Sequence, residues 1–263
     1  MVYLTITLLG LTFGSFVNAM VGRLRAGQNF VNDRSACDSC GHVLGWRDLV
    51  PLVSWLSLGG RCRYCSQPIS IQNPVVEIVT AGLFALSFYT WDFTPELAWF
   101  GLSLWLAITV CMVAIALYDI RYYQVPMYIA YLMLLLGLGL YGVNVLAAGE
   151  PIASAAVPLL WQLLAAVSLI VLPWAVSRGK WMGSGDIFLA ALSGLVMSSV
   201  VASFGGVLVG FYLGALFTLP LMALGRVNRK SKIPFGPFIL GGIYGWFLWQ
   251  QLLLRLIEQF LGL

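Results

Sequence analysis

Long apolar stretches separated by short polar segments dominate this chain. Eight such stretches can be marked, at residues 2–22, 75–91, 97–118, 126–148, 155–177, 187–201, 203–224 and 236–262. A helix needs about 20 apolar residues to cross the hydrocarbon core of a bilayer. The pattern therefore predicts an all-α polytopic membrane protein with about eight transmembrane helices. The sixth and seventh stretches meet at residues 202–203, so a count of seven stays open.

The composition agrees with this prediction. Of the 263 residues, 60% are hydrophobic and 9% are charged, whereas an ordinary soluble domain carries about 25% charged residues. Such a composition excludes a disordered chain, a coiled coil and a collagen-like fibre. The longest polar segment separates the first two apolar stretches. It divides the chain into a first transmembrane helix (1–22), a loop domain (23–74) and a membrane-embedded helical domain (75–263).

The basic residues indicate the orientation in the membrane. Thirteen of the fourteen Lys and Arg residues fall in four polar segments, at residues 23–74, 119–125, 178–186 and 225–235. Because basic residues accumulate on the cytoplasmic side, we predict that these segments lie inside and the N-terminus outside. Positive charge follows the first span, which is typical of an uncleaved anchor rather than a cleaved signal peptide. Insertion in the lipid bilayer then explains the net charge of +4, and no nucleic-acid partner is predicted.

Four cysteines of the loop domain are spaced as two pairs, Cys37-x-x-Cys40 and Cys62-x-x-Cys65. Each pair places two thiolates on a tight turn, and two such turns facing each other complete a tetrahedral zinc site. Four cysteine ligands leave no position for water, so the predicted Zn²⁺ is structural. Such a metal suits a domain of about 50 residues, which buries little core unaided.

Other interpretations of these cysteines have less support. Two disulfides need an oxidising compartment, whereas the charge pattern places the loop in the reducing cytoplasm. Covalent haem attachment needs a histidine directly after the second cysteine, and here Gly41 separates Cys40 from His42. Thiols without a metal remain an alternative. We expect His42 to be a surface residue, and Cys111, inside an apolar stretch, to be a packing residue.

Two aspartates lie at the predicted cytoplasmic ends of spans. Asp119 closes the third apolar stretch, and Asp186 opens the sixth after Gly183-Ser184-Gly185. Ionisable residues near the hydrocarbon are costly and often functional. Two close carboxylates share one proton, so one can act as an acid and the other as a base toward water. The flanking glycines would let a substrate backbone approach Asp186. The pair predicts an aspartyl protease centre.

Structural interpretations of the same residues stay open. Aspartate is a favoured helix N-cap, which would account for Asp186, and Asp119 could pair with Arg121. Glu77, just inside the second stretch, could be an interfacial residue. Asn18 could pack the first helix against a neighbour.

The order of these motifs resembles the type IV prepilin peptidase family, whose members are bifunctional leader peptidases and N-methyltransferases. The resemblance covers nearly the whole chain. Besides the four cysteines, it rests on Phe13-Gly14-Ser15-Phe16-Val17-Asn18, Arg23-Leu24, Leu49-Val50-Pro51-Leu52-Val53-Ser54-Trp55-Leu56, Pro74-x-x-Glu77, Asp119, Gly183-Ser184-Gly185-Asp186 and Ile233-Pro234-Phe235-Gly236-Pro237-Phe238. The Gly-x-Gly-Asp element alone is shared with other intramembrane aspartyl proteases, but its combination with the N-terminal motif and the four cysteines is highly specific.

The resemblance implies an inner-membrane enzyme with two activities. Asp119 and Asp186 would form the catalytic pair, in a protease core over about 97–263. They would cut the basic leader from prepilins and type II secretion pseudopilins at the cytoplasmic membrane face. The enzyme would then methylate the new N-terminus with S-adenosyl-L-methionine. In such families methyl transfer is associated with the first span, the loop and a glutamate, which places that function at Gly14, Asn18, Arg23 and Glu77.

The chain departs from the family pattern at two places. Arg25 follows Arg23-Leu24 where the family usually has proline, and no proline occurs from Gln28 to Ala36. These changes leave the aspartates intact, but they make a peptidase without methyltransferase activity an alternative. A membrane transporter with a zinc-stabilised loop is the alternative from a different class. It has less support, because the chain lacks two related halves and its acids lie at the membrane boundary.

Overall fold

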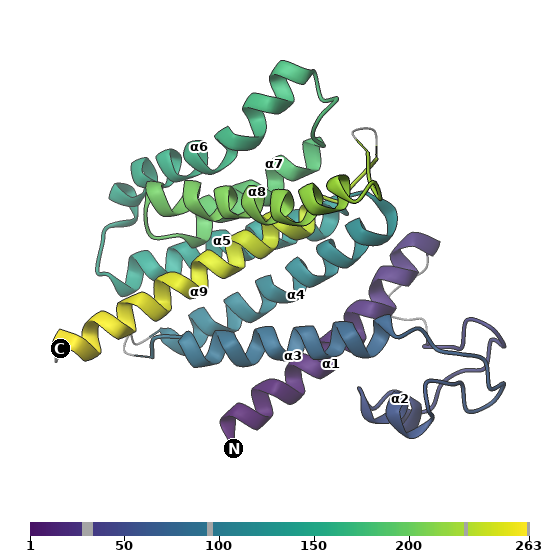
Figure 1. Ribbon diagram of the computed structural model, residues 1–263. Helices are drawn as coiled ribbons and strands as arrows, with labels where there is room; N and C mark the ends of the chain where they lie inside the picture. The colour runs from purple at the N-terminus through teal and green to yellow at the C-terminus, as the bar shows by residue number, and fades with distance from the viewer. Residues whose placement is uncertain (28–33, 94–96, 229–230, 262–263) are drawn as a thin grey trace. The chain divides into compact units, whose positions relative to one another are not determined.

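The computed structural model of the chain describes residues 1–27, 34–93, 97–228 and 231–261. Within these ranges the regular structure is helical, apart from two isolated antiparallel bridges, Ala36 with Val43 and Arg61 with Pro68. The all-α fold predicted from the sequence is confirmed. The helices (Figure 1) are α1 (Val2–Ala26), the 3-10 helix η1 (Trp46–Asp48), α2 (Val53–Ser57), α3 (Gln72–Thr90), α4 (Ala98–Tyr122), α5 (Met127–Ala147), α6 (Ile152–Ser177), α7 (Ser184–Val196), α8 (Val200–Ala223) and α9 (Gly236–Leu261).

The predicted apolar stretches correspond to helices α1 and α3 to α9. Five helices, α1, α4, α5, α6 and α8, are long and apolar enough to cross a membrane. In α1, α5, α6 and α8, less than half of the most apolar segment is buried inside the protein, which leaves apolar side chains to face the bilayer. In α4 more than half of that segment is buried. The chain is therefore a multi-pass membrane protein.

The sixth apolar stretch differs from its prediction. It forms α7, whose 13 residues extend about 20 Å at the rise of an α-helix. This is shorter than the hydrocarbon core of about 30 Å. The break before α8 falls at residues 197–199 rather than at 202–203. Ser199 sets this boundary, because its side chain accepts a hydrogen bond from the backbone N–H of Ala202 at 3.2 Å and caps α8. The two stretches form two helices and not one.

The chain divides into two compact units, Met1–Tyr89 and Thr90–Leu263. Unit 1 contains α1, η1, α2 and nearly all of α3, together with the four paired cysteines. Unit 2 contains α4 to α9 and both aspartates of interest. The two groups of candidate functional residues therefore belong to separate units.

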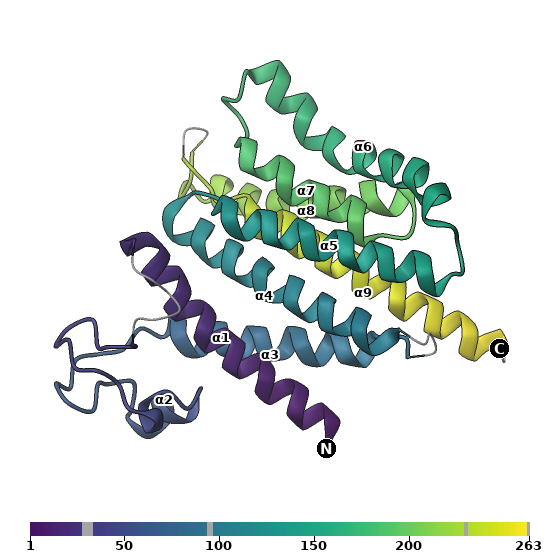
Figure 2. The ribbon, with the colours of Figure 1, turned by 180° about the vertical axis from the view of Figure 1, so that it is seen from behind.

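In unit 1, α1 and α3 pack against each other and run antiparallel (Figure 2). The contact is closest at two glycines of α1. A Cβ added at Gly10 would lie 2.6 Å from the Cα of Ala81, and one at Gly14 would lie 2.6 Å from the Cα of Glu77. Small residues four apart allow helix backbones to approach this closely. The contact brings Glu77 beside α1.

In unit 2, α4 and α9 build an aromatic part of the core. Trp105 of α4 is fully buried. Its ring stacks on Phe247 of α9 with centroids 3.8 Å apart and on Tyr244 with centroids 5.6 Å apart. Stacked rings bury a large apolar area and fix the mutual orientation of the two helices.

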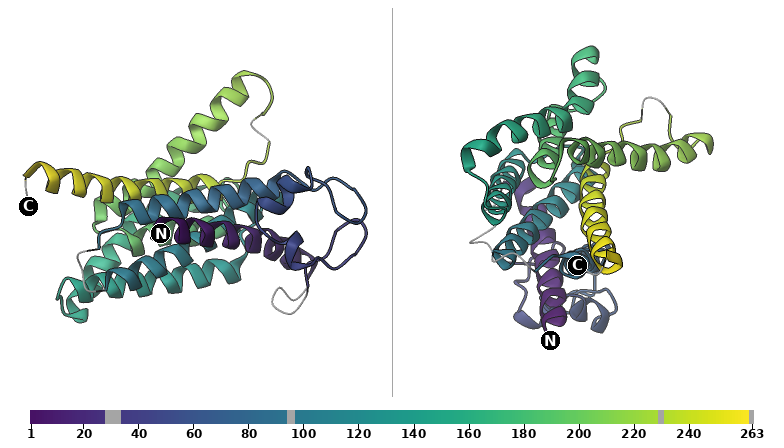
Figure 3. Two further views of the ribbon diagram at one scale, coloured as in Figure 1. Left: turned by 90° about the horizontal axis from the view of Figure 1, so that it is seen from below. Right: turned by 90° about the vertical axis from the view of Figure 1, so that its left-hand side faces the viewer.

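Helices α8 and α9 cross at a second set of glycines and diverge toward the loop that joins them (Figure 3). Gly206, Gly210 and Gly214 recur every four residues on α8, and Gly242 of α9 lies opposite the first two of them. A Cβ added at Gly242 would lie 2.6 Å from the Cα of Gly210. Backbones in such close contact interlock, so the crossing fixes the position of α9 and of its first turn.

Candidate active site and metal centre

The C-terminal end of α4 and the N-terminal ends of α7 and α9 meet at one end of unit 2 (Figure 1). This arrangement brings Asp119 of α4 and Asp186 of α7 together. Both side chains are buried, with 6% and 8% of their residue surface exposed. They are close enough for the charge of Asp119 to act on Asp186. Two buried carboxylates that interact in this way cannot both carry a full charge at low cost.

Asp119 lies in the last turn of α4, where the helix dipole disfavours an anion. A hydrogen bond from a distant part of the chain offsets this cost. The backbone N–H of Gly236, the first residue of α9, donates to Oδ2 of Asp119 at 2.9 Å. The carboxylate of Asp119 is therefore held at the positive N-terminal end of α9, although the residue belongs to the negative C-terminal end of α4.

Asp186 lies in the first turn of α7, and its carboxylate accepts a hydrogen bond from the backbone N–H of Gly183. The N-cap residue is Gly183, which places Asp186 three positions further along, so the structural interpretation of Asp186 as an N-cap is wrong. The glycine beside it has a packing role. A Cβ added at Gly185 would lie 2.8 Å from the Cβ of Val125, in the connection between α4 and α5. The missing side chain of Gly185 therefore makes room for Val125, and this contact keeps the start of α7 close to the end of α4.

The four paired cysteines of unit 1 form one cluster. Their sulfur atoms all lie within 4.8 Å of one another, and Sγ of Cys37 lies 3.8 Å from Sγ of Cys65. A tetrahedral zinc site with Zn–S bonds of about 2.3 Å has sulfurs about 3.8 Å apart. All four are free thiols in this structure, and the distance between the sulfurs of Cys37 and Cys65 is well beyond an S–S bond of about 2.05 Å. The cluster fits a metal ion bound by four sulfurs.

The two cysteine turns have the same local structure. In the first, the N–H of Cys37 donates to the carbonyl of His42 at 2.9 Å, and in the second the N–H of Cys62 donates to the carbonyl of Gln67 at 2.8 Å. Each turn closes through a residue with positive φ, Gly41 at 70° or Ser66 at 58°. The matching turns present two sulfurs each to a common centre.

Two of the four thiols, those of Cys37 and Cys65, have pKa values shifted in opposite directions. The backbone N–H groups of Cys40 and Ser39 lower the pKa of Cys37 to about 6. Cys65 receives a similar bond from Gln67, but burial and the other sulfurs outweigh it and raise its pKa to about 12. A closely spaced set of thiols does not ionise fully on its own.

The surface of the cysteine module is tied together by polar and aromatic contacts. Nε of Arg63 donates to Oδ1 of Asp48 at 2.7 Å, and the hydroxyl of Tyr64 donates to Oδ2 at 3.1 Å. The hydrogen bond from Arg63 keeps the pKa of Asp48 below its usual value. His42 is exposed and its ring lies 3.6 Å from that of Tyr64. It behaves as the expected surface residue.

Three of the four residues that the family resemblance associates with methyl transfer lie together where α1 meets α3. Gly14 contacts the backbone of Glu77, and Glu77 accepts hydrogen bonds from the side chain of Ser15 and from the N–H of Leu52, the latter at 2.7 Å. Asn18 lies one turn further along α1. Glu77 is thus a buried carboxylate held by donors from two parts of unit 1.

The side chains of Asn18 and Arg23 are engaged within the chain. The amide nitrogen of Asn18 donates to the carbonyls of Gly14 at 3.3 Å and Asn73 at 3.2 Å, and its oxygen accepts from Gln72 at 3.0 Å. Arg23 donates to the hydroxyl of Ser35 at 3.0 Å. Asn18 therefore joins α1 to the start of α3, in line with its expected packing role.

Both units of the chain match models of known protein families. Residues 8–91 match the model of the bacterial peptidase A24 N-terminal domain, and residues 106–219 match that of the type IV leader peptidase family. A prepilin leader peptidase/N-methyltransferase of Xanthomonas campestris is 30% identical over 97% of this chain and 94% of its own length.

The chain belongs to the type IV leader peptidase family. Two further relatives with the same name support this assignment. The protein of Pseudomonas aeruginosa is 29% identical over 97% of this chain and 93% of its own length. The protein of Myxococcus xanthus is 31% identical over 85% of this chain, and the match spans 64% of that relative. No solved structure matches the chain.

The two family models follow the division of the structure. The N-terminal model ends at residue 91, and unit 1 ends at Tyr89. The leader peptidase model begins at residue 106 and includes both Asp119 and Asp186 of unit 2. The paired aspartates therefore lie in the part of the chain that matches the model of the type IV leader peptidase family.

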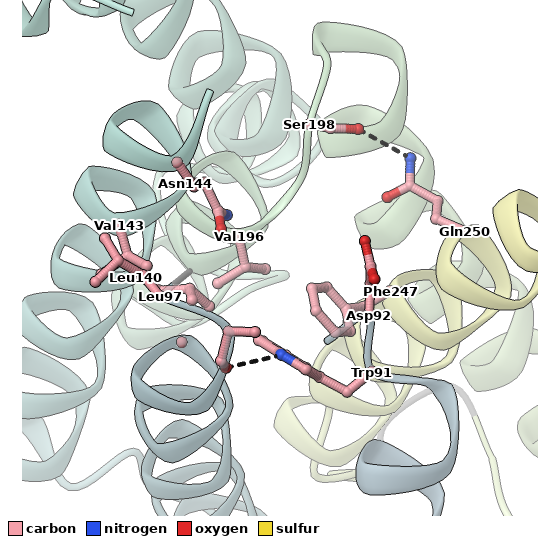
Figure 4. Close-up of a pocket in the computed structure, with 13 residues that line it drawn as sticks. Trp91, Asp92, Leu97, Leu140, Val143, Asn144, Val196, Ser198, Phe247 and Gln250 are labelled. Carbon is pink, nitrogen blue, oxygen red and sulfur yellow. Dashed lines mark hydrogen bonds between the residues drawn. The ribbon is translucent and has the colours of Figure 1, made fainter. Parts of the chain in front are cut away.

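A cavity of about 240 Å³ opens at the other end of unit 2 (Figure 4). Asp92, Asn144 and Ser198 contribute polar groups to its wall. Ala98 also lines it, and Asp119 lies 21 residues further along the same helix, which corresponds to about 30 Å. This cavity is separate from the paired carboxylates, so Asp119 and Asp186 do not line the hollow in Figure 4.

Two contacts of the candidate sites have no signal of their own in the sequence. Gly236 stands inside a family motif, but nothing in the sequence indicates its hydrogen bond to Asp119. The second contact is the hydrogen bond that the N–H of Leu52, also inside a family motif, donates to Glu77. Leu52 is the central residue of a γ-turn: its φ is 61°, and the N–H of Val53 donates to the carbonyl of Pro51 at 2.6 Å. This turn is rare and strained for a residue other than glycine. At Gly236 the sequence offers one local signal: a glycine followed by a proline at the start of a predicted helix.

Gly14 allows a direct test of helix packing in unit 1. We expect Gly14→Ala to destabilise the contact between α1 and α3 by about 1–3 kcal/mol, because the added Cβ overlaps the backbone of Glu77. Gly22→Ala on the same helix is the matched control, since nothing lies within 4 Å of its added Cβ. Crosslinking of cysteines introduced in α1 and α3 measures the contact. Equal crosslinking in both variants would contradict the close packing at Gly14.

Proposed function

We propose that the chain cleaves the leader peptide from prepilins and then methylates the new N-terminus. The observation that carries this proposal is the pair of buried, interacting carboxylates of Asp119 and Asp186 in a member of the type IV leader peptidase family. The names of its relatives combine the two activities. Type II secretion pseudopilins are included as substrates, because the sequence resemblance extends to the enzymes that process them.

Asp119 and Asp186 would perform the peptide hydrolysis as an acid–base pair. One carboxylate is ionised and accepts a proton from water as the water attacks the scissile carbonyl. The other is protonated and donates its proton to the carbonyl oxygen. As the tetrahedral intermediate collapses and the C–N bond breaks, one of its hydroxyl protons returns to the carboxylate that had donated its proton, and the other carboxyl group protonates the leaving nitrogen. The burial of both groups supports this role, because it makes the shared proton the favoured state.

The membrane orientation determines which part of a prepilin reaches this site. The basic segments 119–125 and 178–186 contain the two aspartates, and by the positive-inside rule they would lie on the cytoplasmic side of the inner membrane, with the N-terminus outside. A basic leader stays on that same side for the same reason. The scissile bond then lies where the leader joins the hydrophobic helix of the substrate, at the depth of Asp119 and Asp186.

The second activity is assigned to unit 1. S-adenosyl-L-methionine would supply an electrophilic methyl group to the new N-terminal amine. That amine must lose a proton to act as a nucleophile, and Glu77 is the buried carboxylate of unit 1 that could accept it. Gly14 and Asn18 would hold Glu77 in place through the contact of α1 with α3, and Arg23 would tie α1 to the cysteine module.

The cysteine cluster would bind Zn²⁺ as a structural ion. Its four sulfurs fit the spacing of a tetrahedral site and fill all four positions. Such an ion would hold the module in shape on the cytoplasmic side. It would take no part in peptide hydrolysis, which the aspartates of unit 2 perform.

Mass spectrometry of a prepilin incubated with the purified protein and S-adenosyl-L-methionine tests the proposal. We expect loss of the leader and the addition of one methyl group to the mature N-terminus. Loss of the leader without methylation would show a peptidase that lacks the second activity. An unprocessed prepilin and pseudopilin, with protein that is inserted and folded, would contradict the proposal and favour the transporter alternative.

A further inference from the structure

The first turn of α9 has a single backbone donor directed away from the helix. The first N–H groups of an α-helix lack partners within it. Here the N–H groups of Phe238 and Ile239 both donate to the carbonyl of Phe235, at 3.1 and 3.2 Å, and Pro237 has no N–H. The N–H of Gly236 remains, and it donates to Asp119. The positive end of α9 is thus directed at one carboxylate oxygen.

The space around this bond is filled. A Cβ added at Gly236 would lie 2.8 Å from Oδ2 of Asp119 and 3.2 Å from Cδ1 of Leu189. Leu189 is fully buried, and Asp119 is nearly so. A larger residue at position 236 would therefore push the carboxylate away from the amide that holds it. Glycine is required here by the close approach to the Asp119 side chain and not by its own φ angle, which is not positive.

The glycines of the α8–α9 crossing set the position of this donor. Gly210 lies against Ile239, where an added Cβ would be 2.8 Å from its Cα, and Gly214 lies against the ring of Phe235 at 2.8 Å. These contacts flank Gly236 in the sequence of α9. They leave the first turn no freedom to move along α8, so the N–H of Gly236 is held in place before any substrate arrives.

We infer that Gly236 is a positioning residue for peptide hydrolysis. Its backbone N–H fixes the rotamer of Asp119 and stabilises the ionised carboxylate, while its missing side chain leaves room for that carboxylate to face Asp186. The inference rests on the proposed function of the aspartate pair. It adds a third element, α9, to a catalytic centre otherwise built from α4 and α7.

The variant Gly236→Ala tests this role. We expect kcat for prepilin cleavage to fall about 100-fold, because a misplacement of about 1 Å in a catalytic group has an effect of that size. KM should stay within about twofold, since Gly236 acts on Asp119 and not on the substrate. Methylation of an already cleaved pilin should be unchanged, because it is assigned to unit 1.

Two alanine variants on the same helix are matched controls. Nothing lies within 4 Å of the Cβ added at Gly245, and at Gly241 the nearest atom is a methyl group of Leu213 at 3.8 Å. Gly245→Ala and Gly241→Ala should both cleave at the wild-type rate. Wild-type cleavage by Gly236→Ala would overturn the inference, whereas a wild-type protein that cleaves no prepilin would refute the proposed function itself.

A double variant separates the effect on Asp119 from crowding of the core. Leu189→Val removes the Cδ1 atom that the new methyl group would meet, but it leaves the overlap with Asp119. We expect Gly236→Ala/Leu189→Val to remain as defective as Gly236→Ala. Recovery of cleavage in the double variant would show that crowding of Leu189 was the cause and would overturn the inference.

A measurement without any change at position 236 completes the test. Amide hydrogen exchange at Gly236 should be slow in the wild type and about tenfold faster or more in Asp119→Ala, which removes the acceptor of a charge-assisted bond. The amide of Gly245 serves as the internal reference. Equal exchange at Gly236 in the two proteins would overturn the inference even if Gly236→Ala proved to be misfolded.

Discussion

Replacing either aspartate of the pair with asparagine is expected to abolish leader cleavage. Asp119→Asn and Asp186→Asn should each lower kcat by about 10³-fold or more, because general acid–base catalysis by one group contributes roughly 10²–10⁴-fold and neither residue can act without the other. Asparagine keeps the shape and can still accept the hydrogen bond from Gly236. The protein should therefore insert and fold. Single-turnover cleavage of a purified prepilin, followed by mass spectrometry, measures the effect.

Asp92→Asn is the matched control for this experiment. Asp92 is an acid of the same unit, but it lines the cavity at the opposite end. We expect it to cleave at the wild-type rate, which separates the role of the pair from a general effect of charge in unit 2. Substantial cleavage by purified Asp119→Asn or Asp186→Asn would rule out the acid–base assignment.

Local signals in the sequence were sufficient for most of the fold. Each helix of about 20 apolar residues is determined by its own segment, so α1, α4, α5, α6 and α8 could be predicted without knowledge of their neighbours. The boundary between α7 and α8 could not, because the apolar pattern continues through Val200 and Val201. A serine cap at Ser199, and not a change in hydropathy, marks the start of α8.

The candidate sites show the same division between local and distant information. The cysteine cluster follows from two local turns, and the aspartates stand out because acids are rare near the hydrocarbon. The bond from Gly236 to Asp119 joins positions 117 residues apart in the sequence. This hydrogen bond forms only because α8 and α9 interlock and fix the first turn of α9. In the same way, the γ-turn at Leu52 is held by the hydrogen bond from Leu52 to Glu77. Contacts of this kind become visible only when the helices are assembled.

The largest structural effect is expected from loss of the cysteine cluster. Cys37→Ser/Cys40→Ser removes half of the four sulfur ligands. We expect the zinc content to fall from about one ion per chain to less than about a tenth, since two remaining thiolates do not form a closed tetrahedral site. Structural zinc contributes about 10–16 kcal/mol of binding free energy in small domains of this kind, so the module should lose its folded structure. Metal analysis and limited proteolysis of the segment between α1 and α3 measure the two effects.

Cys111→Ala is the matched control for this prediction. Cys111 is the remaining cysteine of the chain and lies buried in α4, in the other unit. Its replacement should leave the zinc content and the proteolysis of the module unchanged. Because the aspartate pair belongs to unit 2, part of the cleavage activity should survive Cys37→Ser/Cys40→Ser, while methyl transfer, which is assigned to unit 1, should be lost. An unchanged zinc content in that variant would remove the metal from the proposed function, and intact methylation would separate the module from the second activity.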